Sequence, residues 1–167
     1  MAVLQLRYEG DPILRQKAKP VEKITRRIIQ TLKDMEETMY AADGVGLAAP
    51  QVGILQRMFV VDVGDGPLHL INPVIVSAEG SDIDREGCLS FPGLYGYVER
   101  AARVRLHALD PKGKSVRIEA EGLLARALQH ELDHLDGILF IDKATGLARV
   151  QADADAVRAE TRSGAEG

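Results

Sequence analysis

The sequence is poor in several features that define particular classes of protein. Its single cysteine cannot form an internal disulfide, which fits a reducing compartment or metal ligation. Positive charge is not in excess either, because 21 lysines and arginines stand against 25 aspartates and glutamates, a formal net charge of −4. This balance argues against a general binder of nucleic acids or of anionic membranes.

Long apolar runs are also missing. No segment approaches the roughly 20 apolar residues that a membrane-spanning helix needs. Residues 1–7 lack the basic start and the apolar run of a signal peptide. We therefore expect a soluble, cytoplasmic protein with no membrane partner and no specific nucleic-acid partner.

The length and the hydrophobic content fit one folded unit. A chain of 167 residues with 46% hydrophobic residues can bury a core without disulfides. Beyond residue 143 the sequence is mostly Ala, Arg, Asp and Glu with little apolar periodicity. We expect a single domain over residues 1–143, which the motifs below make catalytic, and a tail over 144–167 that is a weak helix or disordered.

Hydrophobic periodicity predicts an α+β fold. Apolar residues at three- and four-residue steps indicate an amphipathic N-terminal helix over 21–42 and a largely buried helix over 122–136, stopped by Gly137. Residues 139–141 read as extended chain. Alternating patterns and turn residues predict further strands at 57–63, 67–71, 74–78, 104–108 and 116–120. We expect antiparallel or mixed sheets packed around the second helix as a central helix.

That central helix carries a candidate metal site. His130 and His134 are four residues apart, so their imidazoles lie on one helix face and can hold one ion. Glu131 falls between them, offset around the helix, where its carboxylate can take a proton from a bound water. This is the H-E-x-x-H pattern of metallohydrolases. Two histidines still need a third ligand.

The third ligand is not supplied by the usual downstream positions. An extended metalloprotease pattern requires a third histidine where this chain has Phe140. The later glutamates, Glu160 and Glu166, lie in the expected tail. Cys88 is the better candidate, because the glycine and serine around it in segment 86–90 suit an accessible strand end or turn. A Cys-His-His set suits Zn(II) or Fe(II) and leaves a position for water.

With these residues in place, the chain resembles the peptide deformylase family. Three motifs of that family occur in order, GVGLAAPQ at 44–51, EGCLS at 86–90 and HELDH at 130–134. The segment 10–15 also resembles the start of the family, so the likeness covers roughly residues 4–143. It implies hydrolysis of the formyl group from the N-terminal formyl-methionine of new polypeptides, releasing formate.

The resemblance implies which residues hold the metal. The ligands are Cys88, His130 and His134. The family works best with Fe(II), so we expect Fe(II) in the cell and Zn(II) or Ni(II) as substitutes in purified protein.

The resemblance also implies the catalytic roles. Glu131 serves as the general base and then the general acid. The side-chain amide of Gln51 and the backbone N–H of Leu89 stabilise the charge that develops on the formyl oxygen. Glu86 and Arg100 match an ion pair that braces the cysteine motif.

Two further charged residues belong to the expected second helix. Asp133 either orients a ligand or faces solvent. Arg126 is charged where an apolar residue often stands in the family, so we expect an altered rim of the methionine pocket. The residues that the resemblance assigns to substrate binding are Val45, Gly46, Gly87, Leu123, Arg126 and Ala127.

Two other functions remain open from the sequence. A zinc endopeptidase would use the same histidines and Glu131 but would take its third ligand from Glu160. A non-catalytic module associated with peptide or RNA would hold a structural metal with four protein ligands, and no second cysteine is present.

Transient association with the ribosome extends the deformylase interpretation. Arg149, Arg158 and Arg162 could contact RNA, although the acidic residues among them are typical of a solvated tail.

Overall fold

The computed structural model describes residues 2–150. Within this range the chain forms two α-helices, three short 3-10 helices and eight strands, in two antiparallel sheets. The elements in chain order are η1 (Pro12–Arg15), α1 (Arg26–Ala41), β1 (Gly46–Ala48), η2 (Ala49–Val52), β2 (Met58–Val61), β3 (Leu68–Glu79), β4 (Asp82–Cys88), β5 (Phe91–Arg100), β6 (Arg103–Leu109), β7 (Ser115–Glu121), α2 (Gly122–Leu135), η3 (Phe140–Asp142) and β8 (Thr145–Arg149).

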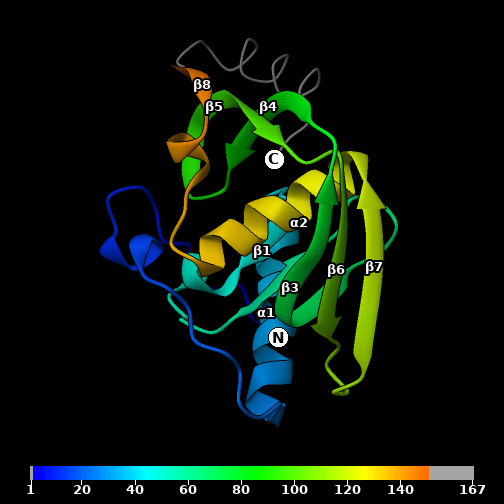
Figure 1. Cartoon of the computed structure of the whole chain (residues 1–167). Coiled ribbons are helices and arrows are strands. Elements are labelled where there is room, and N and C mark those ends of the chain that lie inside the picture. Colours follow the sequence, from blue (N-terminus) through cyan, green and yellow to red (C-terminus); the bar gives the residue numbers. More distant parts are fainter. Residues whose placement is uncertain (1, 151–167) are drawn as a thin grey trace.

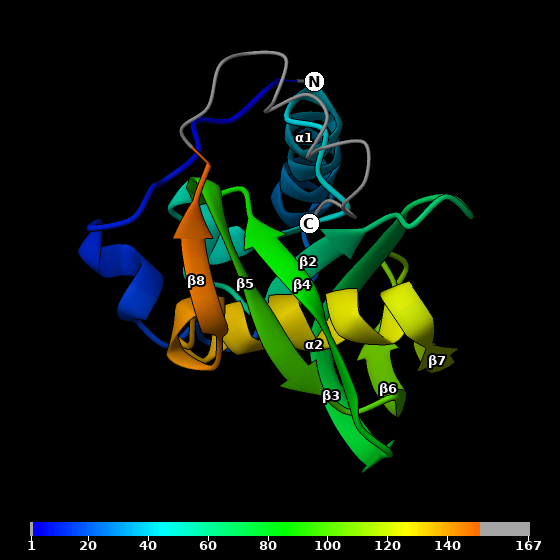
Figure 2. The same ribbon diagram turned by 90° about the horizontal axis from the view of Figure 1, so that it is seen from above.

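The two sheets lie on different sides of α2. The larger sheet has the strand order β1-β2-β3-β6-β7, and the smaller has the order β4-β5-β8. Figure 1 and Figure 2 show the smaller sheet over α2, and α2 also contacts β1, β2, β6 and β7 of the larger sheet. The α+β class expected from the sequence is therefore confirmed. No helix in the described part of the chain is long and apolar enough to cross a bilayer.

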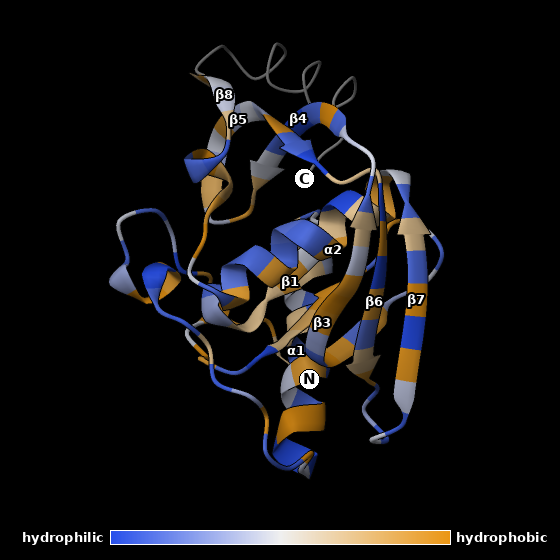
Figure 3. Ribbon diagram, viewed as in Figure 1, coloured by the Kyte–Doolittle hydropathy of each residue, from blue (hydrophilic) through white to orange (hydrophobic). Residues whose placement is uncertain are grey.

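The larger sheet is buried on both faces near β2. Met58 and Val60 pack into the cluster of apolar residues around α1, whereas Phe59 and Val61 pack into the cluster around α2. All four side chains are fully buried, which explains a continuous apolar run in place of alternation. At β6 and β7 the outer face of the larger sheet is exposed to solvent, and Figure 3 shows hydrophilic and hydrophobic residues alternating along these two strands.

The first helix begins later than expected. The pattern predicted a helix from residue 21, but α1 begins at Arg26 because Thr25 is its N-cap and accepts a hydrogen bond from the Ile28 backbone N–H. Val21 is buried ahead of the helix and is held by two hydrogen bonds between its backbone and the Asn72 side-chain amide.

The strands predicted at 67–71 and 74–78 form one strand, β3. Asn72 has φ of +52°, and the register with β6 shifts between Ile71 and Val74. Pro73 therefore sits in a bulge, where its missing N–H costs no ladder hydrogen bond. A proline that seemed to separate two strands is accommodated inside a single one.

The end of the described chain corrects two expectations. Residues 139–141 are not extended throughout, because Phe140–Asp142 form the 3-10 helix η3 and the Asp142 side chain accepts from the Leu139 N–H. The segment after residue 143 does not start as a weak helix or disordered tail, because Thr145–Arg149 form β8 and pair with β5. Residues 145–149 form a strand because they pair with β5, and burial does not explain it, since every residue of β8 is exposed. Residues 151–167, with Arg158, Glu160, Arg162 and Glu166, lie outside the described residues.

Candidate metal centre

The second helix presents two buried histidines on one face. His130 is 8% exposed and His134 is 1% exposed, and their ring centroids lie 5.1 Å apart. The same helix buries Ala125, Leu128 and Leu135 in the core beside the larger sheet. The apolar packing of α2 therefore fixes where the imidazoles are held.

The cysteine reaches the histidines from the end of β4. Cys88 is the last residue of β4 and pairs with Phe91 across a two-residue connection, just after a shift in register. Such a bulge re-aims a side chain. The Cys88 Sγ lies 3.4 Å from the His134 Nε2, and one possible ligand atom from each of Cys88, His130 and His134 lies within 4.8 Å of the others. Residues far apart in the sequence thus converge on one point.

A buried carboxylate orients the first histidine. The His130 Nδ1 lies 2.9 Å from the Glu86 Oε1, which is the partner expected of an Nδ1–H donor and leaves Nε2 available as a ligand. Burial opposes protonation of His130, but hydrogen bonds with Cys88 and Glu86 outweigh it and raise its pKa. Burial would likewise raise the pKa of Glu86, but hydrogen bonds from His130 and Arg100 lower it.

The donor atoms fit a divalent metal with a preference for sulfur and nitrogen ligands. Burial lowers the pKa of His134, which favours the neutral form of its imidazole. A buried thiol and two imidazoles make up three ligands and leave a fourth position open. This set matches Zn(II) or Fe(II) chemistry better than that of Mg(II) or Ca(II), which take oxygen ligands.

Glu131 stands beside this set with one oxygen unused. Its side chain is 4% exposed, and its Oε1 has no hydrogen-bond partner among the described residues. Burial raises the pKa of Glu131 to about 7. The carboxyl group also lies so close to β1 that a Cβ on Gly46 would be 2.5 Å from the Glu131 Oε2. A buried carboxyl group with a near-neutral pKa suits the transfer of a proton in both directions.

Gln51 is held with its amide nitrogen toward the cysteine. Its Oε1 accepts from the Ala48 N–H at 2.9 Å, which fixes the orientation of the amide. Its Nε2 then lies 3.1 Å from the Ser90 Oγ and 3.5 Å from the Cys88 Sγ. The residue is 1% exposed. A buried N–H donor is thus fixed at the edge of the metal centre.

A pocket opens next to these groups. Five of the six residues expected to bind substrate line it, and Gly46 instead touches Glu131. Leu89 lies outside the pocket lining. Its side chain lies close to Gly44, because a Cβ added to this glycine would be 2.5 Å from the Leu89 Cδ1. The pocket lining consists of Val45, Asp84, Arg85, Glu86, Gly87, Leu123, Arg126, Ala127, His130 and Glu131.

Several contacts at the site were not apparent from the sequence. Ser90 hydrogen-bonds Gln51, and its place in the cysteine motif was the available signal. Phe140 stacks on the His130 ring with centroids 6.1 Å apart, although in the sequence it served only to exclude a third histidine. Asp133 does not simply face solvent, because its Oδ2 accepts from Arg100 at 2.9 Å and pairs with Lys143 at 3.0 Å.

Comparisons with known sequences agree with this geometry. A family model described as polypeptide deformylase matches residues 3–150. The peptide deformylase of Desulfitobacterium hafniense is 56% identical over 149 residues, which is 89% of this chain and 99% of the relative. That of Halothermothrix orenii is 59% identical over 145 residues, 86% of this chain and 94% of the relative.

Solved structures give the same result. The crystal structure of peptide deformylase from Thermotoga maritima has a TM-score of 0.85 and 47% identity, covering 87% of this chain and 99% of that one. The enzyme from Synechococcus elongatus, solved in complex with actinonin, has a TM-score of 0.83 and 48% identity, covering 86% of this chain and 81% of that one. By its sequence and its fold, this chain belongs to the polypeptide deformylase family.

Proposed function

We propose that this chain hydrolyses the formyl group from the N-terminal formyl-methionine of newly made polypeptides and releases formate. The observation that carries the proposal is the convergence of Cys88, His130 and His134 beside the partly unpaired carboxyl group of Glu131. In this proposal α2 is the central helix that carries the catalytic motif, and α1 is the amphipathic helix that supports the sheet from its other face.

Cys88, His130 and His134 would hold the metal. A bound divalent ion supplies Lewis acidity, which lowers the pKa of a bound water and polarises a carbonyl group. We propose Fe(II) in the cell, with Zn(II) or Ni(II) as substitutes, because one thiolate and two imidazoles accept all three ions. Glu86 contributes by holding the His130 Nδ1, so that the other ring nitrogen faces the centre.

Glu131 moves the proton. Its carboxylate takes a proton from the attacking water and delivers it to the departing nitrogen, one group acting as base and then as acid. The pKa of about 7, raised by burial, allows both steps near neutral pH. Gly46 keeps the space beside this carboxyl group free, since any side chain there would displace it.

Gln51 and Leu89 stabilise the charge that develops on the formyl oxygen. The Gln51 amide nitrogen is already oriented by Ala48, so no reorganisation is needed during the reaction. The Leu89 backbone N–H provides a second donor directly after the cysteine. Each such donor contributes about 3 kcal/mol of transition-state stabilisation in comparable sites.

The peptide would bind as an added strand. Strand β1 ends the order of the larger sheet, so its second edge is available to the backbone of an extended peptide. Val45 and Gly46 would offer backbone groups at this edge, and Gly87 of β4 would offer them from the smaller sheet. Leu123 and Ala127 would form the apolar wall for the methionine side chain.

The substrate also suggests where the protein works. Formylated chains arise at the ribosome, so we propose a cytoplasmic enzyme that associates with ribosomes transiently. Arg149, one of three arginines considered for RNA contact, is paired with Glu9 in the structure, so this association does not depend on a free Arg149.

The test uses anaerobically prepared, Fe(II)-loaded protein with formyl-Met-Ala-Ser and an assay for formate. Wild type should release formate, whereas Glu131→Ala and Cys88→Ala should not. Glu119→Ala, which changes an exposed carboxylate, serves as the matched control and should retain wild-type activity. A metal-loaded wild type that releases no formate refutes the function. Formate release by Cys88→Ala leaves the deformylase function in place and refutes the ligand set. The endopeptidase alternative is tested separately, by cleavage of unformylated internal peptides by wild type and by Cys88→Ala.

A further inference from the structure

Arg126 does not direct its charge into the pocket that it lines. Its side chain is 8% exposed, and its guanidinium group lies among oxygen atoms of β4 and β5. Nη1 donates to the Glu86 Oε2 at 2.6 Å and to the Val98 carbonyl at 2.9 Å, while Nη2 donates to the Asp82 carbonyl at 2.9 Å. Only the aliphatic part of the side chain is left to form pocket wall. The guanidinium therefore adds no charge to the pocket rim, because it is buried and neutralised by partners away from the pocket.

The carboxylate that receives Arg126 is the one that orients a histidine. Glu86 Oε1 accepts from the Arg100 Nη2 and lies 2.9 Å from the His130 Nδ1. Glu86 Oε2 accepts from the Arg100 Nε and the Arg126 Nη1, each at 2.6 Å. Arg100 binds both oxygens of the Glu86 carboxylate in a bidentate pair, and Arg126 of α2 donates a further hydrogen bond to one of them.

These charges form a balanced network. Asp82 lies 3.5 Å from Arg126, and Asp133 pairs with both Arg100 and Lys143. Three cations face three carboxylates, so neither arginine is left without compensation in the interior. The members are Arg100, Arg126 and Lys143 with Asp82, Glu86 and Asp133.

The positions of Arg126 and His130 on α2 explain why this contact matters. They are four residues apart, so they occupy the same helix face and both reach Glu86 of β4. Cys88 follows Glu86 by two residues on the same strand. The Glu86 carboxylate therefore connects the helix that carries the histidines to the strand that carries the cysteine. Arg126 adds a second hydrogen bond between this helix and the same carboxylate.

We propose that Arg126 is a positioning residue of the metal centre, holding the Glu86 carboxylate so that His130 and Cys88 keep the spacing needed for one ion. The proposal rests on the proposed function insofar as that function requires a metal at Cys88, His130 and His134. Residues that orient a metal ligand in this way typically contribute 10- to 100-fold to metal affinity.

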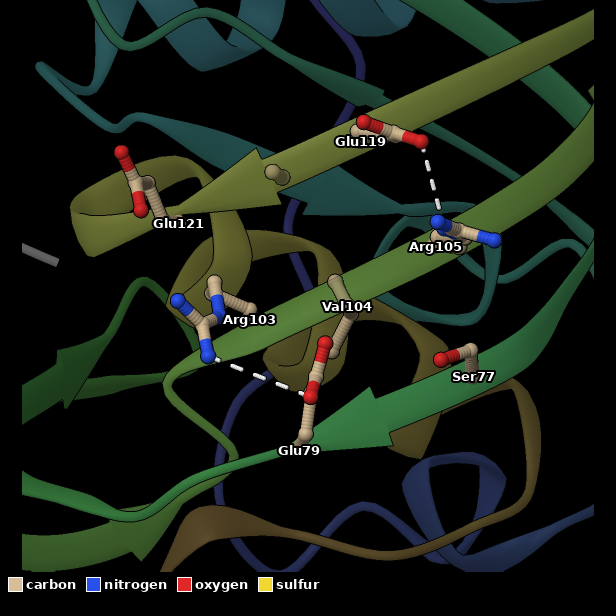
Figure 4. A pocket seen from close by; sticks show the side chains of 8 residues that line it. Ser77, Glu79, Arg103, Val104, Arg105, Glu119 and Glu121 are labelled. Carbon is tan, nitrogen blue, oxygen red and sulfur yellow. Dashed lines mark ion pairs between the residues drawn. The ribbon is translucent and has the colours of Figure 1, made fainter.

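The test compares Arg126→Met with wild type and with Arg105→Leu. Methionine retains an unbranched apolar stem against the pocket but removes the guanidinium. Arg105 pairs with Glu119 on the exposed face of the larger sheet, which Figure 4 shows, so its substitution controls for the loss of one arginine charge. Zn(II) affinity is measured by competition with a chromophoric chelator. Selectivity is measured as the ratio of kcat/KM for formyl-Met-Ala-Ser and formyl-norleucine-Ala-Ser at saturating metal.

The expected result is a loss of about 10- to 100-fold in Zn(II) affinity for Arg126→Met, with the methionine-to-norleucine ratio and the affinity of Arg105→Leu unchanged. An unchanged affinity overturns the proposal. If the Zn(II) affinity is unchanged and the methionine-to-norleucine ratio changes, Arg126 affects binding of the substrate side chain and not the metal. A residue needed only for folding would lower the melting temperature of the metal-free protein and leave the affinity intact.

A second variant covers a failure of Arg126→Met to fold. Arg126→Lys keeps the charge but cannot reach all three oxygens at once, so its Zn(II) affinity should fall at least threefold, and a wild-type affinity would overturn the proposal. If wild type binds Zn(II) but releases no formate, the proposed function fails while the affinity comparison still decides the role of Arg126.

Discussion

Replacing Glu86 by glutamine should destabilise the protein strongly, although the two side chains have nearly the same shape. Glu86 is the carboxylate shared by Arg100 and Arg126, and the three side chains are 4%, 2% and 8% exposed. Removing one partner of a buried ion pair leaves an uncompensated charge and costs about 3–5 kcal/mol. Domains of this kind have a total stability of about 5–15 kcal/mol. At about 2–4 °C per kcal/mol for a chain of this length, the melting temperature should fall by roughly 6–20 °C.

The free energy of unfolding is measured by urea denaturation, followed by circular dichroism, in the presence of a chelator. The chelator separates the loss of the ion pair from any loss of metal binding. Glu119→Gln is the matched control, because Glu119 pairs with Arg105 at 3.2 Å but its side chain is 76% exposed. An exposed pair of this kind contributes less than about 1 kcal/mol. If Glu86→Gln costs no more than this control, the argument that the buried network needs Glu86 is refuted.

The dependence on pH gives a second check on the same variant. Hydrogen bonds from His130 and Arg100 outweigh burial and lower the pKa of Glu86 from its ordinary value of 4.5. The stabilisation is therefore present above the unfolded-state pKa and is lost as the pH falls toward the lowered folded-state value. Glutamine does not titrate, so the difference in stability between wild type and Glu86→Gln should narrow below about pH 4.5. A difference that widens on acidification would contradict this assignment.

Three further predictions concern other parts of the molecule. Gly46→Ala would place a Cβ 2.5 Å from the Glu131 Oε2, so kcat for formate release should fall about 100-fold through misplacement of the carboxylate, with Zn(II) affinity unchanged. The hydrogen bond to Asp62 raises the pKa of Tyr40 to about 12, so Asp62→Asn should return the phenolate absorbance transition of one tyrosine toward pH 10. Leu128 is fully buried, so Leu128→Ala should cost about 2–5 kcal/mol in urea denaturation.

Each of these predictions has a result that contradicts it. Wild-type kcat for Gly46→Ala would mean that Glu131 can move aside without loss. An unchanged alkaline titration in Asp62→Asn would place the cause of the Tyr40 shift elsewhere. A cost below about 1 kcal/mol for Leu128→Ala would mean that the core around α2 collapses around the missing side chain.

The sequence alone determined the features that depend on neighbours along the chain. The four-residue spacing of His130 and His134 fixes their common face on any α-helix, whatever the surrounding fold. The alternating residues at 104–108 and 116–120 predicted two strands, which are observed as β6 and β7 and pair with each other. Such patterns are local because the periodicity of a helix or strand is set by its own backbone.

Sequence patterns were less informative where distant segments decide the local structure. Asn72 and Pro73 suggested a break between strands, but bonds from the Asn72 side chain to Val21 and pairing with β6 allow a bulge within β3. The segment 145–149 has no strand pattern of its own and becomes β8 because β5 offers an edge. In both cases hydrogen bonds to residues far along the chain outweigh local preference.

At the candidate metal centre, the sequence pointed to three possible ligands, and the tertiary structure decided how they are held. Motif and composition pointed to Cys88, but only the packing of β4 over α2 brings its Sγ to 3.4 Å from the His134 Nε2. Sequence reasoning placed Arg126 at the pocket, whereas the structure turns its guanidinium to Glu86. A buried charge must find its counter-charge within the interior, and which carboxylate lies within reach is set by the packing of the whole chain rather than by spacing along it.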